Sequence, residues 1–171
     1  MKKWKLKGVL LSLLIIAALI GILSVGGFSY FSSLELASNL SKQLLEERIE
    51  KGIQTMRYYV GESYGRLTMN QGILSDENGL SLNDRSELVD RVSEDLGVVS
   101  TIFSRDKDDF IRITTSIRAA DGKRAVGTFL GKNSAAYDPI LSKKRYIGQA
   151  LILGGPYLTG YDPVLDGTGQ V

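Results

Sequence analysis

The hydrophobic pattern begins with an almost unbroken apolar run that is uncharged from residue 8 to residue 34. It follows four lysines, Lys2, Lys3, Lys5 and Lys7. A helix needs roughly 20 apolar residues to cross a hydrocarbon core, so residues 9–31 are predicted to form a transmembrane helix. Because positive charge is retained on the cytoplasmic side, we expect residues 1–8 in the cytoplasm and residues 32–171 outside.

A cleaved secretory signal is the alternative interpretation of this run. Signal peptides carry a shorter apolar region, about 7–15 residues, that ends at a small-x-small cleavage site. The best site nearby is the weak Leu36-Ala37-Ser38. The length of the run therefore favours a retained anchor.

A helical stripe follows the apolar run between residue 34 and about residue 67. Apolar side chains recur there at steps of three and four, at Leu45, Ile49, Ile53, Met56, Val60, Tyr64 and Leu67. This spacing predicts a long helix that continues directly from the anchor. Two roles stay open for its apolar face, which can pack on the rest of its own domain or pair with the same helix of a second copy.

After this stripe the pattern predicts one short helix. Beyond it, apolar and polar residues alternate with a period of two, which indicates strands. We expect a short strand near 72–74 and a helix from Asn83 or Asp84 to Leu96, ended by Gly97. Strands are predicted at 98–104, 109–118, 124–130, 146–153 and 157–165. Turns are predicted at 105–108, 120–123, 154–156 and 166–169. A further helix is expected over 134–143, where Pro139 fits only a first turn and Asp138 would be the cap. The fold class is α+β with an antiparallel sheet.

The predicted strand 109–118 has two chemically different faces. One carries Ile111, Ile113, Thr115 and Ile117; the other carries Phe110, Arg112, Thr114, Ser116 and Arg118. The isoleucine face is expected to pack on the long helix. If the other face is buried, Arg112 requires an acidic partner or a ligand, because an unpaired buried charge is costly. If it is exposed, it is simply the solvated face of an antiparallel sheet. The pattern alone leaves both readings open.

The last two predicted strands are rich in tyrosine. Tyr146, Tyr157 and Tyr161 lie there, with Thr159 between the last two on the same face. Tyrosine has an apolar ring and a polar tip, which suits the wall of a small-molecule pocket. Tyrosine also favours strands in general, so the pattern fits an ordinary sheet as well.

Composition excludes several kinds of chemistry. The chain has no cysteine and no histidine, so disulfides, Cys or His zinc sites, Ser-His-Asp triads and His-ligated haem are absent. Without the four N-terminal lysines, 17 basic residues face 19 acidic ones, which turns the net charge of +2 into −2. That balance does not favour nucleic acid as a partner. We expect no metal, no cofactor and no catalytic residue.

Four short motifs occur in order along the second half of the chain. They are 112–116 (RITTS), 122–128 (GKRAVGT), 146–150 (YIGQA) and 155–163 (GPYLTGYDP). This series resembles the single Cache sensor domains, of the Cache 3/Cache 2 type, of bacterial chemoreceptors and related transmembrane signal transducers. The resemblance covers about residues 34–171.

The resemblance implies a PAS-like antiparallel sheet behind the long helix, outside the membrane, that binds a small metabolite such as an organic acid. It implies a methyl-accepting chemotaxis protein, with a homodimer formed through the N-terminal helix. By position, the ligand-binding residues would be Arg112, Thr114, Ser116, Tyr146, Tyr157, Thr159 and Tyr161.

The sequence departs from the family pattern at residue 171. The family's final strand, second membrane helix and cytoplasmic output part do not appear, so we expect an incomplete domain whose closing strand is missing. The sensor part of a histidine kinase or of a cyclic-dinucleotide enzyme is an alternative.

Two alternatives belong to other classes of protein. A pilin-like structural subunit would carry a glutamate in the apolar segment, and this segment has none. A membrane-anchored hydrolase would need carboxylates, but Asp106, Asp108 and Asp109 lie in a predicted turn.

Overall fold

The computed structural model describes residues 2–165, 169 and 171, except for the side chains of residues 2–19, 22–27 and 31. The chain divides into two compact units, Met1–Leu44 and Leu45–Val171. The backbone of α1 (Lys2–Tyr64) is one continuous helix, which confirms that the predicted long helix continues from the apolar run. It ends where Gly65 takes a left-handed conformation, with φ of 62°.

No helix long and apolar enough to cross a membrane occurs among the side chains that the structure describes. The predicted anchor, residues 9–31, lies mostly outside that set, since only residues 20, 21 and 28–30 of it are described in full.

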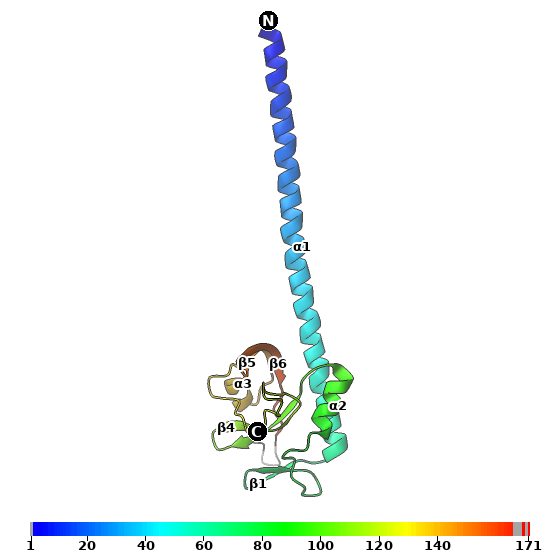
Figure 1. Cartoon of the computed structure of the whole chain (residues 1–171), viewed down its shortest axis with the longest axis vertical. Helices are drawn as coiled ribbons and strands as arrows, with labels where there is room; N and C mark the ends of the chain where they lie inside the picture. The colour runs from blue at the N-terminus through cyan, green and yellow to red at the C-terminus, as the bar shows by residue number, and fades with distance from the viewer. Residues whose placement is uncertain (1, 166–168, 170) are drawn as a thin grey trace. The chain divides into compact units, whose positions relative to one another are not determined.

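The second unit is an α+β domain with short antiparallel hairpins (Figure 1). After α1 come β1 (Thr68–Asn70), β2 (Ile73–Ser75), α2 (Glu87–Leu96), β3 (Thr101–Asp106), β4 (Asp109–Thr115), α3 (Tyr137–Leu141), β5 (Tyr146–Ile152) and β6 (Gly155–Tyr161). The α+β class and the antiparallel pairing are as predicted. The described strands form three two-stranded sheets, β1–β2, β3–β4 and β5–β6, rather than one continuous meander.

Two tight turns set the hairpin registers. Asp106 pairs with Asp109 across a two-residue loop, so β3 runs two residues further than predicted. Ile152 pairs with Gly155, so β6 begins before Pro156 and ends at Tyr161 instead of residue 165. The predicted turn at 166–169 lies largely outside the described residues.

Three local predictions are wrong. Residues 124–130 form no regular strand: Phe129 makes one isolated bridge to β4, and Gly127 and Gly131 break the extended chain with φ of 80° and 85°. α2 begins only at Glu87, because Asp84 has a positive φ of 59° and cannot start a helix. Asp138 lies within the first turn of α3 and is not its cap.

The hydrophobic core consists of two clusters on opposite faces of β4. Ile113 lies in the first cluster, with Tyr64 of α1 and Leu88 and Val92 of α2; Figure 1 shows α2 beside the C-terminal end of α1. Phe110 belongs to the second cluster, with Tyr137 and Ile140 of α3. The prediction that the isoleucine face packs on the long helix is confirmed.

Candidate ligand-binding site

Arg112 is buried at the centre of β4, with only 5% of its surface exposed. Its backbone is held on both sides: β3 pairs Phe103 with it, and on the other side its N–H donates to the Thr128 carbonyl at 2.8 Å. Its own carbonyl accepts from the Gly127 N–H, also at 2.8 Å. The side chain therefore has a fixed origin between two backbone segments.

The guanidinium of Arg112 is incompletely partnered. It donates through Nη1 to the Thr128 hydroxyl and lies 4.9 Å from the centre of the Phe103 ring. Its Nε is buried and has no hydrogen-bond partner. Within the described part of the chain, no carboxylate forms an ion pair with it. Burial lowers the pKa of Arg112, while the nearby Tyr161 hydroxyl acts in the opposite direction.

This arrangement answers the question that the sequence left open about Arg112. Arg112 is buried together with Phe110 and Thr114 of the same face, and among the described residues no acidic side chain forms an ion pair with it. The desolvation penalty of an unpaired buried ion is several kcal/mol. An anion that accepts hydrogen bonds from the guanidinium would offset that penalty, because charge-assisted hydrogen bonds from arginine to carboxylates are strong.

An aromatic wall stands beside the guanidinium. The rings of Phe103 and Tyr161 lie 6.1 Å apart between centres, and those of Tyr146 and Tyr161 lie 6.3 Å apart. Burial raises the pKa of Tyr161, and the positive charge of Arg112 opposes the shift. The Tyr161 hydroxyl is therefore neutral at physiological pH and can donate a hydrogen bond.

A small cavity of about 70 Å³ lies at this place. It is lined by Arg112, Thr128, Phe129, Leu130, Ser134, Leu151, Ile152, Leu153 and Tyr161. Pockets for drug-sized ligands measure about 300–1,000 Å³, so this one suits only a very small group, such as a short-chain carboxylate. The lining combines one cation and three hydroxyl groups with apolar side chains.

The seven predicted ligand-binding residues do not all meet at this cavity. Arg112 and Tyr161 line it, and Tyr146 stands behind Tyr161 while its hydroxyl donates to the Gln149 carbonyl. Thr159 is buried, and its hydroxyl donates to the Gly148 carbonyl. Tyr157 is 44% exposed.

Two predicted residues of β4 and its continuation lie elsewhere. The Thr114 hydroxyl donates to the Arg85 carbonyl at 2.8 Å. The Ser116 hydroxyl accepts from the Ser100 N–H at 2.9 Å and from the Ser93 hydroxyl at 2.7 Å. These hydrogen bonds connect β4 and its continuation to α2 and to the residues on either side of α2. Neither hydroxyl lines the cavity.

Sequence reasoning missed Phe103, Thr128 and Ser134. Phe103 is opposite Arg112 in the β3–β4 register, so a correct turn at residues 107–108 would have identified it. Thr128 lies within the motif 122–128, but its pairing with Arg112 depends on an irregular segment. No sequence signal marks Ser134.

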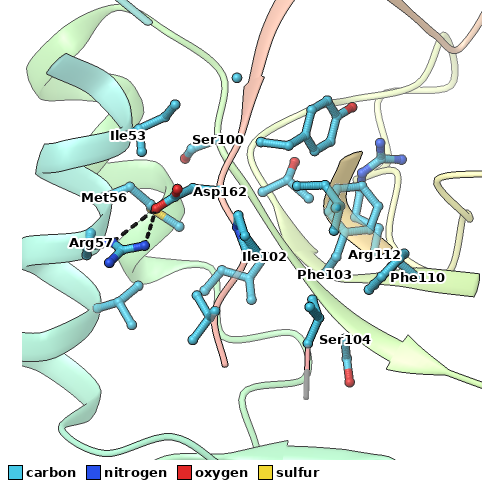
Figure 2. Close-up of a pocket in the computed structure, with 18 of the residues that line it drawn as sticks. Ile53, Met56, Arg57, Ser100, Ile102, Phe103, Ser104, Phe110, Arg112 and Asp162 are labelled. Atoms are coloured by element: carbon cyan, nitrogen blue, oxygen red, sulfur yellow. Dashed lines mark hydrogen bonds and ion pairs between the residues drawn. The ribbon is translucent and has the colours of Figure 1, made fainter. Parts of the chain in front are cut away.

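A much larger cleft, of about 1620 Å³, lies between α1, β3 and β6 (Figure 2). Figure 2 shows Ile53, Met56 and Arg57 on one side and Phe103, Phe110 and Arg112 on the other. Arg112 and Tyr161 line both the cleft and the small cavity.

Asp162, the residue after β6, forms an ion pair with Arg57 of α1 and another with Arg145. It accepts from Arg57 Nε at 3.0 Å and from Arg145 Nε at 2.9 Å, and Arg145 also pairs with Glu50. Burial raises the pKa of Asp162, but the two arginines outweigh it and hold the pKa below its usual range. No group of three or more acidic side chains is placed to hold a metal ion among the described residues.

Residues 29–171 match the family model of the Cache 3/Cache 2 fusion domain. The chain belongs to this family. Cache domains are extracytoplasmic sensor domains of membrane signal transducers, they bind small molecules, and they are generally not enzymes. The resemblance inferred from the four sequence motifs is thereby confirmed at the level of a single Cache sensor domain. Comparisons with curated proteins and with solved structures gave no significant match.

Proposed function

We propose that this Cache domain senses a small organic anion, which binds at Arg112 and Tyr161. The observation that carries the proposal is the buried Nε of Arg112, which has no partner and belongs to a side chain that lines a small cavity. A carboxylate there would accept from Arg112 and from the neutral Tyr161 hydroxyl. The cavity size restricts the ligand to short-chain acids.

The site is tested by calorimetric titration of the full chain in lipid nanodiscs with formate, acetate, propionate, lactate and pyruvate. We expect at least one of these acids to bind. Arg112→Ala should then weaken its binding by about 10- to 150-fold, because a hydrogen bond to a charged group contributes about 1.5–3 kcal/mol.

Arg118→Ala is the matched control. Arg118 belongs to the same predicted strand face but is exposed, and its Nη1 donates to the Gly122 carbonyl. Its removal should leave affinity unchanged. Unchanged affinity in Arg112→Ala would show that the anion site is elsewhere.

We further propose that residues 9–31 anchor the chain in the cytoplasmic membrane as a single span, with residues 1–8 inside and residues 32–171 outside. The four lysines ahead of a long uncharged run support this topology. Mass analysis of the chain purified from membranes tests it. A mature chain that begins near Ser38 would contradict it.

The transducer that fits best is a chemotaxis receptor that forms a homodimer through its N-terminal helix and has no enzymatic activity of its own. The family and the exposed apolar side chains of Leu36, Leu40 and Leu44 on α1 support this proposal. Disulfide crosslinking of single-cysteine variants along residues 36–44 tests the dimer. Crosslinks with a helical period are expected, and an absence of period would refute parallel pairing.

A further inference from the structure

The hairpin between β5 and β6 places a leucine in an unusual turn. Ile152 pairs with Gly155, so Leu153 and Gly154 form a two-residue loop. Both have a positive φ, 50° and 82°, as in the type I′ turns that favour Asn, Asp or Gly at these positions. A leucine adopts this left-handed conformation at a cost in backbone energy. Leu153 is 53% exposed, so burial of its side chain in the core does not offset that cost.

Leu153 lines the small cavity at Arg112, and two more exposed apolar side chains line it as well. Phe129 is 51% exposed and Leu151 is 78% exposed. We call Phe129, Leu151 and Leu153 the apolar rim of the cavity. Exposed apolar side chains are ordinary when they are scattered singly, but three around one cavity mark a binding surface. An alkyl group that covered the rim would remove apolar surface from water, which is favourable.

Charge in the cavity restricts what a ligand can carry besides one carboxylate. Among the described residues that line the cavity, Arg112 is the one charged side chain. The second carboxylate of a diacid would therefore lack a cation there, and the ammonium group of an amino acid would lack an acidic partner. The Thr128 hydroxyl is already engaged, since it accepts from Arg112 and donates to the Ala125 carbonyl at 2.8 Å. The lining thus favours a ligand with one charged end and an uncharged remainder.

We infer that the ligand is a short aliphatic monocarboxylate whose alkyl group lies across the apolar rim. The inference rests on the anion site proposed at Arg112, which would bind the carboxylate. Because the cavity measures only about 70 Å³, the alkyl group of the acid extends over the exposed side chains of the rim. The turn then holds Leu153 for contact with the ligand, which accounts for a leucine in a left-handed conformation.

Calorimetric titration of the full chain in lipid nanodiscs with acetate, propionate, butyrate and valerate tests the inference. Affinity should rise about twofold to fourfold with each added methylene group, the upper figure corresponding to full burial. Succinate and γ-aminobutyrate have as many carbon atoms as butyrate and are the matched control ligands. Each should bind at least about 10-fold more weakly than butyrate, because its second charged group would be desolvated without a partner.

The variant Leu153→Asn separates contact with the ligand from stability. Asparagine is favoured at this turn position, so the melting temperature should stay equal or rise. Acetate affinity should stay unchanged, while the ratio of butyrate affinity to acetate affinity should fall at least about twofold. In the double variant Leu151→Ser, Leu153→Asn the ratio should approach one. The control variant Leu80→Asn changes a leucine that is 61% exposed and does not line the cavity, and it should leave the ratio unchanged.

The outcomes distinguish this inference from the proposed anion site. If acetate binding depends on Arg112 but butyrate binds no more tightly than acetate, only the inference about the apolar rim fails. It fails in the same way if the double variant keeps the ratio of the parent chain, or if succinate binds as tightly as butyrate. If no acid binds, or if Arg112→Ala leaves the binding of every acid unchanged, the anion site is wrong and this inference falls with it.

Discussion

On one face of β4, Ile113 packs against α1 and α2, whereas on the other face Arg112 is buried beside Phe103 with one nitrogen unpartnered. Both residues are almost fully buried and are adjacent in sequence. Hydrocarbon contacts surround the Ile113 side chain, which has no polar group to satisfy. The buried Nε of Arg112 lacks a hydrogen-bond acceptor, so adjacent residues of one strand differ in whether their side chains are fully satisfied.

The largest effect is expected on the isoleucine face. Ile113→Ala should lower the free energy of unfolding by about 2–5 kcal/mol, because it leaves a cavity among Tyr64, Leu88 and Val92. Urea denaturation of the full chain in nanodiscs measures this loss. Affinity for an acid that binds at Arg112 should stay unchanged in the folded protein. A large affinity loss would mean that the two faces are not separate.

Replacement of Arg112 should act in the opposite direction on stability. Arg112→Met removes a buried charge that forms no ion pair with any described carboxylate, so the desolvation penalty of that charge, several kcal/mol, disappears with it. We expect an equal or higher melting temperature together with the loss of acid binding. A fall in melting temperature comparable with that of Ile113→Ala would show that Arg112 is a structural residue.

The opposite orientation of Ile113 and Arg112 was predictable from the sequence, because it depends only on local order, whereas the burial of Arg112 was left open. Side chains alternate along a strand, so Ile113 and Arg112 had to point to opposite faces wherever the strand lay. The end of α2 was equally local, since Gly97 takes the left-handed conformation with φ of 62°. The four short motifs are local in the same sense, because each is a continuous stretch of the sequence.

The surroundings of Arg112 were not predictable, because they depend on chain segments that meet only in the folded state. Phe103 required the exact position of a turn at Lys107, a non-glycine residue with φ of 53°. Thr128 lies on a segment that was expected to be a regular strand, and two glycines prevent that. The β3–β4 and β5–β6 hairpins form separate sheets. The alternation of apolar and polar residues within each hairpin does not indicate whether the two hairpins pair with one another.

The Thr128 hydroxyl, which accepts a hydrogen bond from Arg112, tests how the polar face of β4 is held. Thr128→Val keeps the shape but leaves Nη1 of Arg112 without the Thr128 hydroxyl, which should cost about 1–3 kcal/mol of stability. In the background of Arg112→Met the same substitution should cost clearly less, because the donor is gone. Urea midpoints of the four proteins give the coupling energy, and a coupling near zero would contradict the geometry assigned to this pair.

The smallest effect concerns Asp162, a charge that has the partners Arg112 lacks. Its pKa in the folded chain is lower than in the unfolded chain because Arg57 and Arg145 donate to it. The unfolded state therefore binds the proton more tightly, so this contribution is present above about pH 4 and is lost as pH falls through the folded pKa. Arg57 is largely exposed, which limits the contribution to at most about 1 kcal/mol.

Melting curves between pH 6 and pH 2.5 measure this contribution. The melting temperature of Asp162→Asn should fall less steeply with acidification than that of the parent chain. Equal slopes would mean that the ion pairs of Asp162 do not contribute to the pH dependence of folding.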